Sequence, residues 1–106
     1  MDISEIKRLV LDYRRLLKSR NVTPDVLILF GSQARGSARP DSDIDLAVVS
    51  RCLGKDRFKE GVRLNKLARQ IDPRFEVIPI GIEDYLQKET LSPILHEIKK
   101  TGLILF

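Results

Sequence analysis

Residues 30–49 read FGSQARGSARPDSDIDLAVV and decide the fold, because a small-residue turn and an acidic pair separate two apolar runs. The first run, residues 26–30, has the length of a strand that is buried on both faces. The second run, residues 43–50, begins with Asp43 and Asp45. Side chains alternate along a strand, so both carboxylates share one face, with Cα atoms roughly 6.6 Å apart, while Ile44 faces the other way.

This stretch carries the residue types that hold a metal ion and a polyphosphate. Mg²⁺ prefers oxygen ligands, and one or two protein carboxylates commonly hold it, with water and substrate phosphate as the remaining ligands. Gly31 and Ser32 stand where the first strand must turn into a short helix, at about residues 32–36. Glycine lets the backbone approach a ligand closely, and the N–H groups that follow are suited to an anion. We therefore expect a site for metal and phosphate at this turn.

A third strand, predicted at residues 75–80, supplies another carboxylate. Glu76 is the one charged residue in this run, and Pro79 indicates an edge strand or a strand end. If the strand lies beside the one that carries the acidic pair, Glu76 completes an acidic triad and is also a candidate general base. The alternative is a carboxylate at the rim that pairs with Arg74 or another base.

The remaining segments predict helices that cover a sheet. Apolar stripes indicate amphipathic helices at residues 3–20 and 56–71, the second stripe being Phe58, Val62, Leu64, Leu67, Ala68 and Ile71. Shorter helices are expected at residues 82–89 and 93–100, a polar loop at 36–42, and a last strand at 103–106. The order predicts a mixed α/β (α+β) fold with a small sheet covered by helices, and one domain over residues 1–106.

The amino-acid composition is that of a soluble globular protein. The 106 residues are 42% hydrophobic and 32% charged, with no apolar run long enough to span a bilayer and no signal peptide at the acidic N-terminus. The single cysteine, Cys52, excludes an internal disulfide and fits a cytoplasmic location. The net charge of +4 favours anionic partners without identifying them.

The spacing of these residues resembles that of a known family. Gly31-Ser32, ten residues, and then Asp43-Ile44-Asp45 looks like the signature of the polymerase-beta-type nucleotidyltransferase superfamily. More narrowly, the chain resembles the minimal nucleotidyltransferases that act as antitoxins of HEPN-domain toxins. The segment from Gln33 to Gly36 and the residue Ser42 also match the usual sequence motif of that family.

The resemblance implies a polymerase-beta-like fold and a role for each matching residue. Gly31 and Ser32 would hold the triphosphate of ATP, with Ser42 part of the same nucleotide-binding loop. Asp43 and Asp45 would bind two Mg²⁺ ions, and Glu76 would stand at the third carboxylate position. Arg35 and Arg39 would contact the phosphate tail, unless they are only solvated loop charges. Those eight residues are the candidate site.

The resemblance also implies the reaction and the partner. Members of the family move a nucleoside monophosphate from a nucleoside triphosphate to a hydroxyl and release pyrophosphate. In the antitoxin branch, AMP is transferred to a tyrosine of the toxin. Because the chain ends at Phe106, we expect that a partner chain or a second copy supplies the missing wall of the site.

Two other classes of function are weighed against the enzyme. The chain could be a binding module that neutralises its partner by contact, although such a module has no need for crowded carboxylates at a phosphate loop. It could also be a nucleic-acid-binding protein, but aromatic residues are not interleaved with basic ones and no reading helix is recognisable. Asp43 and the Gly-Ser turn also have the simpler interpretation of an ordinary turn.

Overall fold

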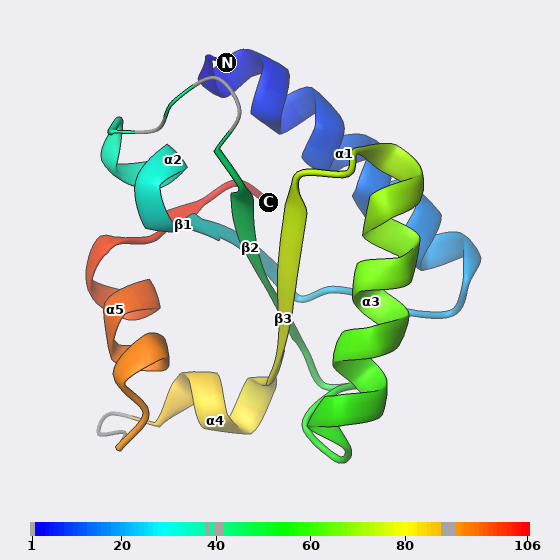
Figure 1. The fold of residues 1–106 in the computed structure, drawn as a ribbon. Coiled ribbons are helices and arrows are strands. Elements are labelled where there is room, and N and C mark those ends of the chain that lie inside the picture. Colours follow the sequence, from blue (N-terminus) through cyan, green and yellow to red (C-terminus); the bar gives the residue numbers. More distant parts are fainter. Residues whose placement is uncertain (1, 38, 40–41, 88–90) are drawn as a thin grey trace.

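The computed structural model describes residues 2–37, 39, 42–87 and 91–106 and arranges them in the predicted order of helices and strands (Figure 1). In chain order the elements are α1 (Ile3–Ser19), β1 (Val26–Phe30), α2 (Gly31–Arg35), β2 (Ile44–Ser50), α3 (Arg57–Ile71), β3 (Phe75–Gly81), α4 (Ile82–Leu86), α5 (Pro93–Thr101) and β4 (Leu103–Ile104). Parts of the predicted loop at 36–42 and helix at 82–89 fall on residues 38, 40, 41, 88 and 89, which lie outside the described residues.

The strands form one mixed sheet in the order β3-β2-β1-β4. β1 runs antiparallel to β2 and to β4, whereas β2 and β3 are parallel. Two parallel strands need a crossover connection, and α3 supplies it. β3 lies at an edge of the sheet, as Pro79 predicts, because proline cannot donate a hydrogen bond to a further strand.

Helices α1 and α3 cover one face of the sheet (Figure 1). The stripe of α1 that contains Ile6, Val10 and Leu17 is buried against alternate residues of the strands. Tyr13, also on this stripe, stacks on Phe75 with ring centroids 5.6 Å apart. Its hydroxyl donates to the backbone oxygen of Leu64 at 2.8 Å, which ties α1 to α3. The cluster of buried residues on this face is the larger of the two in the described residues.

The other face is covered by α5 and α4 (Figure 1). Leu95 and Ile98 of α5 pack on Ile28, Ala47 and Val49 of the two central strands. Ser92 begins α5 as an N-cap whose hydroxyl accepts from the backbone N–H of Leu95, with proline at the next position. The short α4 continues directly from β3. None of the helices in the described part of the chain is both long and apolar enough to cross a membrane.

The predicted stripe of α3 is wrong at its N-terminal end. Leu64, Leu67 and Ala68 are buried, but Phe58 and Val62 are 79% and 56% exposed. With 100° between successive helical residues, Phe58 and Val62 lie more than 90° away from the line of Leu64 and Ala68. Their side chains therefore lie on a second face of α3, beside β3, instead of in the core.

Candidate active site

Two carboxylates share one face of the sheet at the end where β2 and β3 begin, and a third lies just before β2. Asp45 and Glu76 are directly paired in the parallel register of these strands. Asp43 precedes Asp45 by two residues, and the intervening Ile44 is fully buried in the core of the opposite face. Ile44 therefore faces the core as predicted, and the tertiary structure supplies the pairing of Asp45 with Glu76.

Asp45 has the most perturbed environment of these carboxylates. Partial burial raises the pKa of Asp45, and the charges of Asp43, Glu76 and Glu97 raise it further, while Arg35 lowers it. Burial and neighbouring like charges both disfavour an ionised carboxyl group. A bound cation would relieve this repulsion, so the surroundings of Asp45 are those of a cation site in charge and donor type.

The glycine at the turn is required by close approach to Asp45. β1 ends at Phe30, which is paired with Asp45, and α2 starts at Gly31 without an intervening residue. Gly31 has a φ of 71°, and a Cβ atom at this position would overlap the Oδ2 atom of Asp45. The backbone of the turn and the carboxylate are therefore in direct contact. Ser32 follows in the first turn of α2, where the N–H groups have no acceptor within the helix.

Arg35 lies beside the site and is held by a residue that sequence reasoning missed. Its guanidinium donates to Glu97 of α5 at 3.0 Å, and both side chains are about half exposed. Glu97 also acts on Asp45, since its charge raises the pKa of that residue. No local pattern singles out Glu97, because α5 reaches the site only through its packing on β1, which is far away in the sequence. It is the third carboxylate that acts on Asp45, after Asp43 and Glu76.

Ser42 and Arg39 fasten the loop that precedes Asp43. The Ser42 hydroxyl accepts from the backbone N–H of Arg39 at 2.8 Å, and the Ser42 N–H donates to the Arg39 oxygen at 3.0 Å. Gln33 of α2 donates to the Ser42 oxygen at 3.4 Å. The Arg39 side chain is exposed. Ser42 therefore joins the loop to α2 and sets the entry of the chain into β2.

Glu76 forms an ion pair with Arg69, not with Arg74, the neighbouring basic residue named in the sequence analysis. Arg69 of α3 lies 3.6 Å from its carboxylate, and both side chains are about half exposed. Arg74 instead makes a bidentate interaction with Asp72, with a shortest distance of 2.8 Å, and that interaction lowers the pKa of Asp72. The carboxylate of Glu76 thus lies between the face of Asp45 and the basic surface of α3.

The described carboxylates near the Gly31 turn match a divalent cation in donor type but do not form a compact cluster. Across residues 2–37, 39, 42–87 and 91–106, no three His, Cys, Asp or Glu side chains are gathered closely enough to hold an ion. The donor atoms are nevertheless carboxylate oxygens, the type that Mg²⁺ prefers, and the charges of Asp43 and Glu76 act on Asp45. The described residues therefore fit Mg²⁺ in donor chemistry, and they are not drawn together into a preformed metal site.

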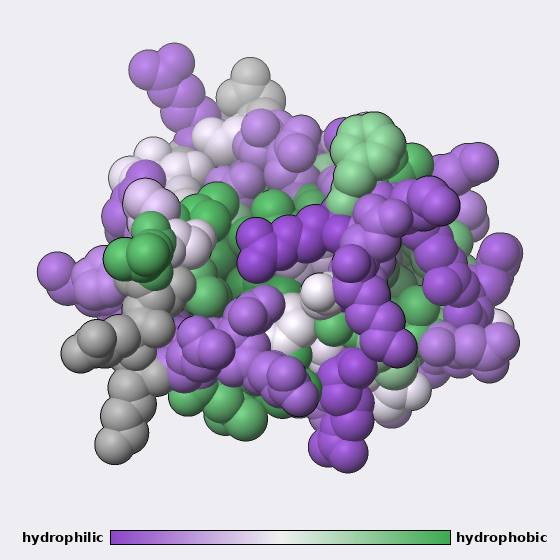
Figure 2. All heavy atoms as spheres, turned by 90° about the horizontal axis from the view of Figure 1, so that it is seen from below, coloured by the Kyte–Doolittle hydropathy of each residue, from purple (hydrophilic) through white to green (hydrophobic). Residues whose placement is uncertain are grey.

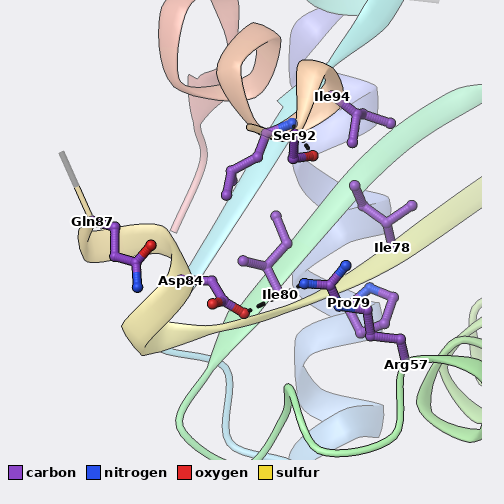
Figure 3. A pocket seen from close by; sticks show the side chains of 9 residues that line it. Arg57, Ile78, Pro79, Ile80, Asp84, Gln87, Ser92 and Ile94 are labelled. Atoms are coloured by element: carbon purple, nitrogen blue, oxygen red, sulfur yellow. Dashed lines mark hydrogen bonds and ion pairs between the residues drawn. The ribbon is translucent and has the colours of Figure 1, made fainter. Parts of the chain in front are cut away.

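A cavity of about 270 Å³ lies farther along the same face of the sheet (Figure 3). Figure 3 shows Ile78 and Ile80 of β3 pointing into it, with Ile94 on the opposite side. Asp84 and Arg57 form an ion pair of 3.6 Å at its edge. Glu76, Ile78 and Ile80 lie on the same side of β3, because alternate residues of a strand share a face. The apolar cavity therefore follows the carboxylates along the same side of this strand.

The family model of the nucleotidyltransferase domain matches residues 10–101. The chain belongs to this nucleotidyltransferase family. The match contains the glycine turn, the acidic pair and Glu76, so the resemblance expected from residues 30–49 is confirmed at the level of the family.

Two solved structures share the fold of this nucleotidyltransferase domain. One is a toxin-antitoxin structure with AMP-PNP, with a TM-score of 0.59 and 23% identity over 94% of this chain and 72% of that chain. The other is a candidate nucleotidyltransferase from Sulfolobus solfataricus, with a TM-score of 0.65 and 18% identity over 94% of this chain and 78% of that chain. No protein with a curated description matches the chain. The likeness confirms the mixed α/β (α+β) fold.

Proposed function

We propose that this chain, as a minimal domain over residues 1–106, is a cytoplasmic Mg²⁺-dependent nucleotidyltransferase that moves AMP from ATP to a hydroxyl of a partner protein. We further propose that it is an antitoxin and that the partner is a HEPN-type toxin. The observation that carries the proposal is the pairing of Asp45 with Glu76 in the sheet, with Asp43 two residues before Asp45 and the Gly31 turn against the Asp45 carboxylate. Membership of the nucleotidyltransferase family supports the reaction class, and the toxin-antitoxin structure with the same fold supports the choice of partner.

Each residue of the site has a role in this reaction. The N–H groups after Gly31, together with Ser32 and Ser42, bind the triphosphate, and Arg35 and Arg39 contact its tail. Asp43, Asp45 and Glu76 would hold two Mg²⁺ ions, which supply positive charge to the transferring phosphate and the leaving pyrophosphate. These assignments follow the positions of the residues on the turn, on α2 and at the start of β2 and β3.

The proposed transfer needs only ATP and the acceptor hydroxyl as reactants. The acceptor oxygen forms a bond to the α-phosphorus as the bond between that phosphorus and the bridging oxygen breaks. Pyrophosphate leaves with the electrons of the broken bond, and the hydroxyl proton passes to a carboxylate. Glu76 is the candidate for this base, through a carboxylate oxygen that no metal ion occupies, because it is half exposed and paired with Asp45 on the neighbouring strand.

A second candidate function is neutralisation of the partner by contact alone. The ion pairs Arg69–Glu76 and Arg35–Glu97 favour it, because they engage two side chains that the reaction assigns to metal or phosphate. In that case the carboxylates would matter only through their charge. The two functions differ in their dependence on Asp43 and Asp45.

The test combines the chain with labelled ATP, Mg²⁺ and the protein encoded beside it. We expect transfer of label to that protein, and a loss of about a hundredfold or more in Asp43→Asn/Asp45→Asn. Asp12→Asn/Glu83→Gln is the matched control, because it removes two exposed carboxylates elsewhere and should transfer normally. Inhibition of the partner that persists in Asp43→Asn/Asp45→Asn, without any transfer by the unaltered chain, would establish the contact mechanism instead.

A further inference from the structure

The outer side of β3 and the second face of α3 enclose an open groove of about 690 Å³. We call it the α3–β3 groove and define it by Phe58, Val62, Lys66 and Arg69 of α3 and by Glu76 and Pro79 of β3. Gly61 of α3 faces Pro79 across the groove, with room for a Cβ atom 3.8 Å from the proline ring. The groove adjoins the cavity in Figure 3, with which it shares Arg57, Ile78 and Pro79 as lining residues.

Two large apolar side chains stand exposed along this groove. Phe58 and Val62 are one helical turn apart on α3, so they form a single apolar strip. Figure 2, which views the end of the molecule where α3 begins and α4 lies, shows apolar residues exposed between strongly hydrophilic ones. Exposed apolar surface rimmed by charged residues is typical of an interaction site.

The groove is closed to an added β-strand. The side-chain amide of Asn65 donates to the Val77 oxygen at 2.8 Å and accepts from the Val77 N–H at 2.8 Å. Pro79 has no N–H to offer, and the Phe75 N–H donates to the Asp72 oxygen at 3.3 Å. Backbone pairing at this edge is therefore blocked, and an occupant must bind through its side chains.

The charges around the groove select the type of occupant. Arg57, Lys66 and Arg69 line it, against the single acid Glu76. Arg57 and Arg69 each have an acidic neighbour at 3.6 Å, whereas Lys66 makes no ion pair with any described residue. A second copy of this chain, with a net charge of +4, would bring two basic rims together in a symmetric interface. An acidic protein surface is the complementary partner.

We propose that the α3–β3 groove is the docking surface for the partner protein, which inserts an apolar side chain from an acidic helix between Phe58 and Val62. The proposal rests on the proposed function for the identity of the partner. Glu76 lies at the end of the groove and is paired in the sheet with Asp45. Docking in the groove therefore brings the partner to the edge of the candidate active site.

The test measures binding of the protein encoded beside this chain to the full chain and its variants. We expect Phe58→Ser/Val62→Ser to weaken binding at least tenfold, because exposed aromatic anchors dominate interfaces. Leu86→Ser/Leu91→Ser changes two comparably exposed apolar residues outside the groove and should bind normally. Lys66→Glu should slow association several-fold at low salt, whereas Lys7→Glu, on the exposed side of α1, should not.

Four outcomes separate this proposal from the proposed function. Equal binding by the groove variants and their controls overturns the groove and leaves the transferase untouched. Groove-dependent binding without any transfer of label overturns the transferase and supports the groove. Failure of the unaltered chain to bind its neighbour overturns the docking proposal. Groove-dependent binding of a single-stranded RNA, without protein binding, would make this a nucleic-acid surface and also overturn it.

Discussion

Gly31 lies so close to the carboxylate of Asp45 that a Cβ atom at position 31 would overlap its Oδ2 atom. The contact joins the end of β1 to the start of β2, because Phe30 and Asp45 are paired in the sheet. It fixes where the carboxylate stands relative to the first turn of α2. The position of Asp45 therefore depends on the absence of a side chain at residue 31.

Substitution of Gly31 by alanine should abolish activity at a moderate cost in stability. The added methyl group must displace Asp45, and a displacement of about 1 Å in an active site reduces rates by about a hundredfold. The φ of 71° adds about 1–2 kcal/mol of strain. Gly36→Ala is the matched control, since Gly36 has a φ of 73° and nothing within 4 Å of a Cβ atom. Activity is measured by transfer of label, and stability is measured by thermal unfolding. Equal activity of the two variants would contradict this assignment.

Asp45→Asn should raise the melting temperature at neutral pH while it removes activity. The pKa of Asp45 is raised in the folded chain by burial and by Asp43, Glu76 and Glu97, so the folded state binds this proton more tightly than the unfolded state. Stability therefore falls as pH rises from the unfolded pKa through the raised one, and asparagine avoids this loss. We expect a gain on the order of a few degrees at pH 7 that disappears near pH 3.

The control for this pH dependence is Asp12→Asn, which removes an exposed carboxylate on α1. It should show no comparable gain at pH 7. Mg²⁺ should raise the melting temperature of the unaltered chain and leave that of Asp45→Asn unchanged, because the carboxylate is the proposed ligand. A lower melting temperature of Asp45→Asn at pH 7 would show that Asp45 is a stabilising residue instead.

Glu97→Gln should strengthen ATP binding. The ion pair with Glu97 holds Arg35 at 3.0 Å, and the same carboxylate adds negative charge near Asp45. Loss of that charge frees Arg35 for the phosphate tail, so we expect a several-fold lower Kd for ATP by calorimetry. Arg35→Gln should raise the Kd, and Glu83→Gln, an exposed acid on α4, should leave it unchanged. Stability should change by less than about 1 kcal/mol, because the pair is exposed.

Tyr13→Phe should reduce stability without affecting the active site. The buried hydroxyl donates to the Leu64 oxygen at 2.8 Å, and its removal leaves that carbonyl with one acceptor site unfilled. We expect a loss of about 1 kcal/mol, or about 4–8 °C in melting temperature. Tyr85→Phe is the control, since Tyr85 is only partly buried and its ring, which both residues retain, lies under the Lys99 ammonium group. A loss of transfer activity in Tyr13→Phe at temperatures where it is folded would contradict a purely structural role.

The sequence predicts helices and strands correctly where the signal lies within a few neighbouring residues. The run at residues 26–30 and the Ser92-Pro93 start of α5 were predicted correctly, because strand length and capping chemistry act within a few residues. The helix at residues 56–71 was also predicted, but its apolar face was assigned wrongly at Phe58 and Val62. Helical spacing shows that apolar residues recur, and it does not show which of them a sheet will cover.

The sequence by itself determined the alternation that places Asp43 and Asp45 on one face, the glycine at the turn and the family that this spacing indicates, because these depend on neighbouring residues. Only the tertiary structure decided that Glu76 is paired with Asp45, that Glu97 approaches from α5, and that Arg69 rather than Arg74 faces Glu76. These relationships join residues far apart in the chain. They arise from the parallel pairing of β2 with β3 and from the packing of α5 on the sheet, which the burial of apolar faces drives and no local pattern encodes.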